Sequence, residues 1–87
     1  MTHELKTWPE YFQMVWMGVK NYEIRKDDRN FQAGDVLVLR ELAVLASRYT
    51  GRSILVRVDS VIRKLPRGFG LRAGFCVMSI TVLKRDG

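Results

Sequence analysis

A helical pattern of apolar residues near the start of the chain is the clearest structural signal in the sequence. Apolar side chains recur at the i, i+3, i+4, i+7 and i+8 spacing of one helix face, at Trp8, Tyr11, Phe12, Val15 and Trp16. Thr7 and Glu10 have the spacing of a capping box, and Pro9 falls in the first turn. Gly18 suits the position after a helix end. The pattern predicts a helix between Thr7 and Gly18, with its aromatic side chains in the core.

Alternating apolar and polar residues predict strands in the rest of the chain, over residues 3–7, 21–26, 36–42, 53–63 and about 75–84. The 36–42 segment is apolar on both faces until Arg40 and Glu41, as in a central strand. Residues 26–30 and 64–74 are expected to be loops, and 48–52 a hairpin turn. Residues 43–47 fit either an extension of the strand or a helical turn.

One early helix followed by short strands predicts a mainly β (α+β) fold. We expect a small, mostly antiparallel β-barrel with the N-terminal helix packed across one opening. With 87 residues, of which 47% are apolar, the chain has enough material for one core, so residues 1–87 are interpreted as a single domain.

Cysteine usage and hydropathy favour a cytoplasmic protein. The single cysteine, Cys76, excludes an internal disulfide and lies in an apolar run, where a core role is expected over a reactive thiol. The first residues are polar and do not resemble a signal peptide. The longest apolar runs, Val36–Leu39 and Leu42–Ala46, are far shorter than a membrane span, so no membrane partner is expected.

Charge is distributed unevenly between the two halves of the chain. Residues 1–44 carry six Lys/Arg and seven Asp/Glu, a net −1, whereas residues 45–87 carry nine Lys/Arg and two Asp, a net +7. A basic second half suits contact with phosphate backbones, and a general solubility charge is the alternative. The candidate backbone contacts are Arg52, Arg63, Lys64, Arg67 and Arg72.

The sequence gives little support for a metal site, a cofactor site or a glycine-rich nucleotide-binding loop. One His and one Cys do not provide the ligand cluster of a zinc site, so neither a metal nor a cofactor is expected. Glycines 68, 70 and 74 match neither a dinucleotide-binding nor a P-loop pattern, and the segment after them resembles a strand.

The Gly18–Arg25 segment carries the remaining candidate chemistry. Two interpretations of Lys20, Glu23 and Arg25 are open. They line the wall of a cleft, or they are solvated charges on an edge strand. Strand alternation places Lys20 opposite to Glu23, so both line one cleft only if the chain turns or bulges between them. A Lys20–Glu23 ion pair suits binding better than catalysis, although a desolvated lysine can act as base or nucleophile.

These motifs together resemble the ASCH domain of the PUA-like superfamily. The resemblance lies in Gly-x-Lys at 18–20, Glu-Ile-Arg at 23–25, and Phe31 followed by Gly-Asp-Val-Leu at 34–37. It is closer to a small bacterial and phage subgroup of uncharacterised domains, through the segments His3–Lys6, Asp28–Phe31, Tyr49–Arg52 and Val77–Ile80. The resemblance covers nearly the whole chain in the right order and implies a PUA-like β-barrel.

The resemblance also implies RNA binding in a cleft lined by Lys20, Glu23 and Arg25. Some relatives are enzymes, and in the branch that deacetylates acetylated cytidine the lysine matching Lys20 is catalytic. The assisting threonine of that branch is Glu23 here, and no glutamate follows Glu41 to supply its second-half carboxylate. Asp59, by strand alternation, shares a face with Arg57 and is expected to form a surface pair.

The leading hypothesis is therefore an RNA- or nucleotide-binding module with Lys20, Glu23 and Arg25 in its cleft. Lys6, Trp8 and Arg29 are candidate neighbours of that cleft. The alternative is a small amidohydrolase acting on an acylated or modified cytidine, with Lys20 and Glu23 catalytic. A third hypothesis is an accessory protein that binds another protein or itself through the apolar 42–47 segment, and the oligomeric state stays open.

Overall fold

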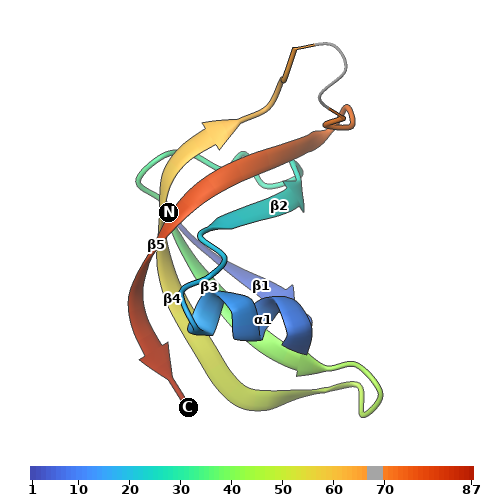
Figure 1. Cartoon of the computed structure of the whole chain (residues 1–87), viewed down its shortest axis with the longest axis vertical. Coiled ribbons are helices and arrows are strands. Elements are labelled where there is room, and N and C mark those ends of the chain that lie inside the picture. Colours follow the sequence, from blue (N-terminus) through green and yellow to red (C-terminus); the bar gives the residue numbers. More distant parts are fainter. Residues whose placement is uncertain (67–69) are drawn as a thin grey trace.

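A curled five-stranded sheet and one short helix make up the fold in the computed structural model, which describes residues 1–66 and 70–87 (Figure 1). The elements are β1 (Thr2–Thr7), α1 (Pro9–Trp16), β2 (Tyr22–Lys26), β3 (Val36–Ala43), β4 (Arg48–Ile62) and β5 (Phe75–Asp86). The expected mainly β class with one N-terminal helix is confirmed. In the described part of the chain, no helix is long and apolar enough to cross a membrane.

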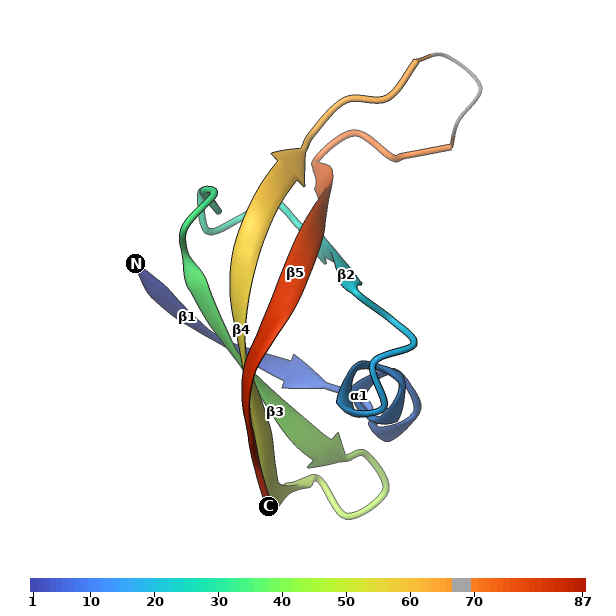
Figure 2. The same ribbon diagram turned by 60° about the vertical axis from the view of Figure 1, so that its left-hand side comes forward.

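The sheet is an open half-barrel with the strand order β1-β3-β4-β5-β2. β1 runs parallel to β3, and the other neighbouring strands are antiparallel. β1 and β2, the two edge strands, are joined along the chain by α1, which lies on one side of the curled sheet (Figure 2). The helix therefore stands at the place where the two free edges of the sheet approach each other.

The core lies inside the curl and is built from alternate residues of the strands. Its buried members are Leu5, Phe12, Val15, Phe31, Leu37, Leu39, Ile54, Val56, Val58, Cys76, Met78 and Ile80. Phe12 and Val15 come from α1, so the helix is fastened to the sheet by one side only. Burial raises the pKa of the Cys76 thiol, which agrees with the expected core role of this residue.

The start of α1 differs from the expected capping box. Trp8 is the N-cap residue and no side chain caps the helix, although Pro9 occupies the first turn as predicted. The Thr7 hydroxyl instead accepts a hydrogen bond from Arg25 Nη2 at 3.1 Å. Thr7 is thus the last residue of β1, and its hydroxyl binds Arg25 of β2 instead of capping the helix.

The β3–β4 hairpin turns earlier than predicted. Residues 44–47 form the turn, and residues 48–52, which were expected to form it, already belong to β4. Gly51 has a φ of 96° inside the strand, close to the register shift between Arg40 and Leu42. Gly51 forms part of a β-bulge. A bulge and a hairpin turn can both require a positive φ, so a glycine in the sequence does not distinguish between them.

Candidate functional site

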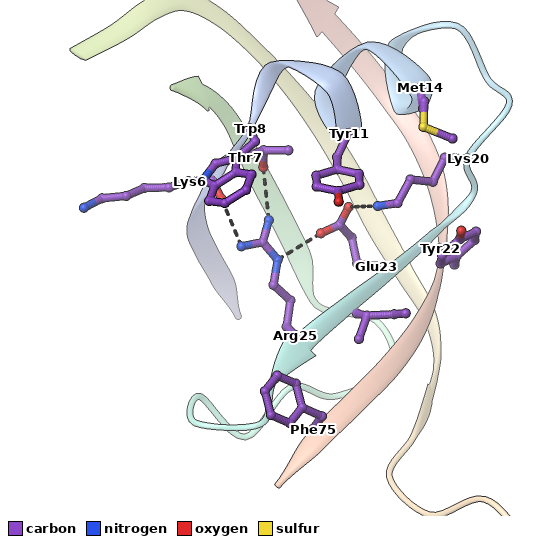
Figure 3. A pocket seen from close by; sticks show the side chains of 11 residues that line it. Lys6, Thr7, Trp8, Tyr11, Met14, Lys20, Tyr22, Glu23, Arg25 and Phe75 are labelled. Carbon is purple, nitrogen blue, oxygen red and sulfur yellow. Dashed lines mark hydrogen bonds and ion pairs between the residues drawn. The ribbon is translucent and has the colours of Figure 1, made fainter. Parts of the chain in front are cut away.

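A cavity of about 660 Å³, called the cleft below, opens between α1, the end of β1 and β2. Figure 3 shows Lys20 and Arg25 reaching Glu23 from opposite sides. The lining residues are Lys6, Thr7, Trp8, Tyr11, Met14, Lys20, Tyr22, Glu23, Ile24, Arg25 and Phe75. The volume is in the range of small-molecule sites, about 300–1,000 Å³.

A chain of charged side chains forms the floor of the cleft. Lys20 Nζ lies 2.7 Å from Glu23 Oε1, and Arg25 Nε lies 2.9 Å from Glu23 Oε2 (Figure 3). Glu23 is 2% exposed and Lys20 is 8% exposed, so the pair is almost fully removed from solvent. The interpretation of these residues as solvated edge-strand charges is therefore wrong, although β2 is an edge strand.

The turn after α1 brings Lys20 to the same side as Glu23. Gly18 follows the helix end with a φ of 80°, and the N–H groups of Val19 and Lys20 both donate to the Met14 carbonyl oxygen. Lys20 consequently precedes β2, so the alternation of side chains along that strand does not determine which way Lys20 points. The turn that the sequence required between Lys20 and Glu23 is present.

The polar face of β2 points toward the interior of the protein. Glu23 and Arg25 point inward, whereas Tyr22 and Ile24 are exposed, with Ile24 at 54%. An ordinary edge strand buries its apolar face, because that burial is favourable. The reversal gives up this burial and places the Glu23 carboxylate in the cleft.

Arginine side chains join the two edges of the sheet beside the cleft. Arg25 on β2 donates from Nη1 to the Lys6 carbonyl at 2.9 Å and from Nη2 to the Thr7 hydroxyl, both on β1. Arg29 donates from Nη1 to the Glu4 carbonyl at 2.8 Å. These contacts keep β1 and β2 in place without a main-chain ladder, so room for the cleft remains between them.

Aromatic side chains form the rim of the cleft. Trp8 and Tyr11 are 53% and 49% exposed, and their rings stack with centroids 6.4 Å apart. The expectation that these two residues lie in the core is therefore wrong, while Phe12 and Val15 from the same stripe are buried as predicted. The stripe is wider than the face that the sheet covers, and its outer margin lines the cleft.

Six lining residues were not predicted to belong to the site: Thr7, Tyr11, Met14, Tyr22, Ile24 and Phe75. Lys20 Nζ lies 5.9 Å from the Tyr11 ring centroid and 5.1 Å from that of Tyr22, so two aromatic faces flank the ammonium group. For Tyr22, its position next to Glu23 in the sequence was a signal that could have placed it at the site. Phe75 gave no such signal, because it reaches the cleft only through the pairing of β5 with β2.

Two of the candidate basic residues of the second half are engaged in ion pairs. Arg52 pairs with the buried Glu41 at 3.0 Å, and the guanidinium beside it holds the pKa of that carboxyl below its usual range. Arg63 pairs with Asp27 at 2.7 Å and also donates to the Phe31 carbonyl. Lys64 and Arg72 are exposed in the β4–β5 connection, and Arg67 lies outside the described residues.

Other carboxylates stay away from the cleft lining. Asp59 forms the expected surface pair with Arg57, with Nε and Oδ1 2.8 Å apart, and also accepts a hydrogen bond from Thr81. Across residues 1–66 and 70–87, no group of three His, Cys, Asp or Glu side chains could hold a metal ion. The cleft offers one carboxylate between two cations, within an aromatic and apolar rim.

Sequence comparison places the chain in a family. A phage relative, described as "Uncharacterized 12.9 kDa protein in GpA 3'region" of Escherichia phage P2, is 41% identical over 59 residues. That match covers 68% of this chain and about half, 52%, of the phage protein. A family model matches residues 2–80, which include every residue that lines the cleft. The chain therefore belongs to the family described as Domain of unknown function (DUF3850).

Proposed function

We propose that this domain is an RNA- or nucleotide-binding module of the ASCH type, which holds a single base in the cleft. The observation that carries the proposal is the combination of a buried Lys20–Glu23–Arg25 floor with an aromatic rim in one cavity of about 660 Å³. The resemblance to ASCH domains points to the same three residues. Lys64 and Arg72, which are exposed in the β4–β5 connection of the basic second half, support a polyanionic partner.

The floor of the cleft is suited to the hydrogen-bonding edge of a base. Glu23 is fixed by a cation on each carboxylate oxygen, and each oxygen retains a further lone pair for an exocyclic amine or ring N–H. Lys20 has three donor protons and gives one to Glu23, so the others are available for a carbonyl or ring nitrogen. Glu23 as acceptor and Lys20 as donor thus lie side by side, which matches the adjacent donor and acceptor groups on the edge of an unpaired base.

The rim supplies the complementary stacking surface. Base–aromatic stacking contributes about 1–3 kcal/mol per base and tolerates different bases. Trp8 and Tyr11 present exposed rings in the lining of the same cleft as the charged floor. Stacking on the rim and hydrogen bonding at the floor together favour a base that is unpaired and turned out of its strand.

Tryptophan fluorescence tests the proposal, because Trp8 lies at the rim. Titration with nucleosides and short single-stranded RNA is expected to quench the fluorescence saturably. Glu23→Gln and Lys20→Ala are each expected to weaken binding about tenfold or more, since each removes a charge-assisted hydrogen bond. Asp59→Asn and Lys84→Ala remove the same charges elsewhere and serve as matched controls. Equal affinity of Glu23→Gln and Asp59→Asn would contradict the proposal.

A small amidohydrolase acting on an acylated or modified cytidine is the second candidate. The 2.7 Å contact of Lys20 with Glu23 supplies the two groups that this candidate needs, the lysine as nucleophile or base and the carboxylate as its proton partner. Two positions of the enzymatic branch depart here: Glu23 replaces its threonine, and no glutamate follows Glu41. Mass spectrometry of N-acylated cytidines after incubation distinguishes the candidates. Deacylation that Lys20→Ala abolishes supports the enzyme, and intact substrates with saturable binding support the binding module.

A further inference from the structure

A second hollow of about 370 Å³ lies beside the cleft and shares part of its wall. Ile24 of β2 and Phe75 of β5 line both spaces, so the two hollows are neighbours that share this part of their walls. The rest of the second hollow is lined by Val77 of β5 and by residues of the connection between β4 and β5, namely Leu65, Gly70, Leu71 and Arg72.

The wall of the second hollow is an apolar strip on the outer face of the sheet. Ile24 and Val77 are direct partners in the β2–β5 ladder, and Phe75 lies two residues before Val77 on the same face. Cys76, between them, points to the core instead. Ile24 is 54% exposed on this strip, which is high for an apolar residue with cross-strand neighbours.

Arg72 adds a single cation to this apolar hollow. Its guanidinium carbon lies 5.6 Å from the Phe75 ring centroid, and its carbonyl oxygen accepts the Phe75 N–H at 3.1 Å. The neighbouring Gly74 carbonyl accepts the Asp27 N–H at 2.8 Å, which fastens this turn to the end of β2. The guanidinium therefore lies beside the ring that lines both hollows.

We propose that this second hollow, the flanking subsite, holds the base of the nucleotide next to the one in the cleft, with the phosphate between them on Arg72. The proposal rests on the proposed function and specifies its ligand as a single-stranded segment of at least two nucleotides. An arginine beside an aromatic ring is the pair that single-strand binders offer to a base and its phosphate. The shared wall formed by Ile24 and Phe75 makes the two base positions neighbours.

Comparison of nucleosides with dinucleoside monophosphates tests the flanking subsite. Dinucleoside monophosphates are expected to bind at least about tenfold more tightly than the nucleosides they contain, because the second base and the phosphate add contacts. Arg72→Gln and Leu71→Ala are expected to remove most of this gain and to leave nucleoside affinity unchanged, since neither residue lines the cleft. Arg48→Gln, an exposed arginine beside the distant 44–47 turn, and Leu83→Ala, an exposed leucine of β5, are the matched controls.

The outcomes separate the flanking subsite from the proposed function. If nucleosides bind but dinucleoside monophosphates bind no better, or if Arg72→Gln behaves like Arg48→Gln, the flanking subsite is wrong and the cleft proposal stands. If neither class of ligand binds, the proposed function itself fails. Tighter binding of base-acylated nucleosides than of dinucleoside monophosphates, lost in Leu71→Ala, would assign the hollow to a base substituent and overturn the proposal.

Discussion

At the scale of single residues, Glu23 combines a buried carboxylate with a place on an edge strand. Its carboxylate is almost completely buried between Lys20 and Arg25, on a strand whose apolar side chains face outward. Removing charges from water is costly, and buried ion pairs often contribute little to folding stability compared with apolar residues of similar size. We interpret this arrangement as serving ligand binding at some expense of stability.

This interpretation predicts different effects of single and double substitutions. Glu23→Ala is expected to lower the free energy of unfolding by about 3 kcal/mol, because Lys20 is left buried without its partner. The double substitution Lys20→Met with Glu23→Leu is expected to lower the free energy of unfolding by about 1 kcal/mol or less, and the proposed function predicts that it abolishes nucleotide binding. Urea denaturation measures both effects. A double variant as unstable as Glu23→Ala would show that the pair stabilises the fold itself.

At the scale of elements, α1 has to be held at the edge of the sheet for the cleft to exist. Phe12 and Val15 pack into the core, and Arg52 of β4 supplies a second attachment. The Arg52 guanidinium lies 5.0 Å from the Phe12 ring centroid and 4.8 Å from that of Trp16, and it pairs with the buried Glu41. Arg52 therefore links α1 to the β3–β4 hairpin.

We predict that Arg52 acts mainly through stability, in contrast to its expected role as a contact to the RNA backbone. Arg52→Ala is expected to lower the free energy of unfolding by about 3 kcal/mol, because it leaves the Glu41 carboxylate buried and uncovers two aromatic rings. Thermal or urea unfolding measures the loss, with Arg48→Ala as the exposed control. At a temperature where the variant is folded, the slope of RNA affinity against salt should be unchanged. A shallower slope would restore Arg52 as a phosphate contact.

At the scale of the whole molecule, a buried polar cluster fastens the start of the chain to the approach to β3. Asp35 is nearly buried and accepts from His3 Nε2 at 2.9 Å and from the Gln32 N–H at 3.0 Å. The His3 contact, followed by the Gln32 N–H and the terminal ammonium, lowers the pKa of Asp35 from 3.8 to about 2. Glu41, with its pKa also lowered by Arg52, acts in the same direction.

The lowered pKa of Asp35 predicts how stability depends on acid. A carboxylate whose pKa is lower in the folded state stabilises that state above pH 3.8, and the contribution is lost as pH falls through about 2. The loss attributable to Asp35 is on the order of 2 kcal/mol. Urea unfolding at several pH values measures it. Asp35→Asn should be less stable near neutral pH and should lose less between pH 4 and pH 2, whereas the exposed Asp28→Asn should follow the unmodified chain. Parallel acid profiles for Asp35→Asn and the unmodified chain would contradict the assignment.

Local patterns in the sequence were sufficient to predict the helix, the strands and the mainly β class. The apolar stripe of α1 and the alternation of β3, β4 and β5 predict these elements because their periods follow from backbone geometry. The Lys20, Glu23 and Arg25 set was also identifiable, because it combined charges with a helix end and a turn at Gly18. Glycine was less informative, since Gly51 serves a bulge where a hairpin turn was expected.

Tertiary structure alone decided which residues surround this charged set. The aromatic rim was expected in the core, because a helical stripe does not show how much of its width the sheet will cover. Phe75 reaches the cleft only through the pairing of β5 with β2, far apart in sequence. Arg52 and Arg63 resembled free cations, and their partners Glu41 and Asp27 become neighbours only after the sheet has curled. The sequence determined the elements through local periodicity, whereas burial and charge pairing depended on long-range packing that no local pattern encodes.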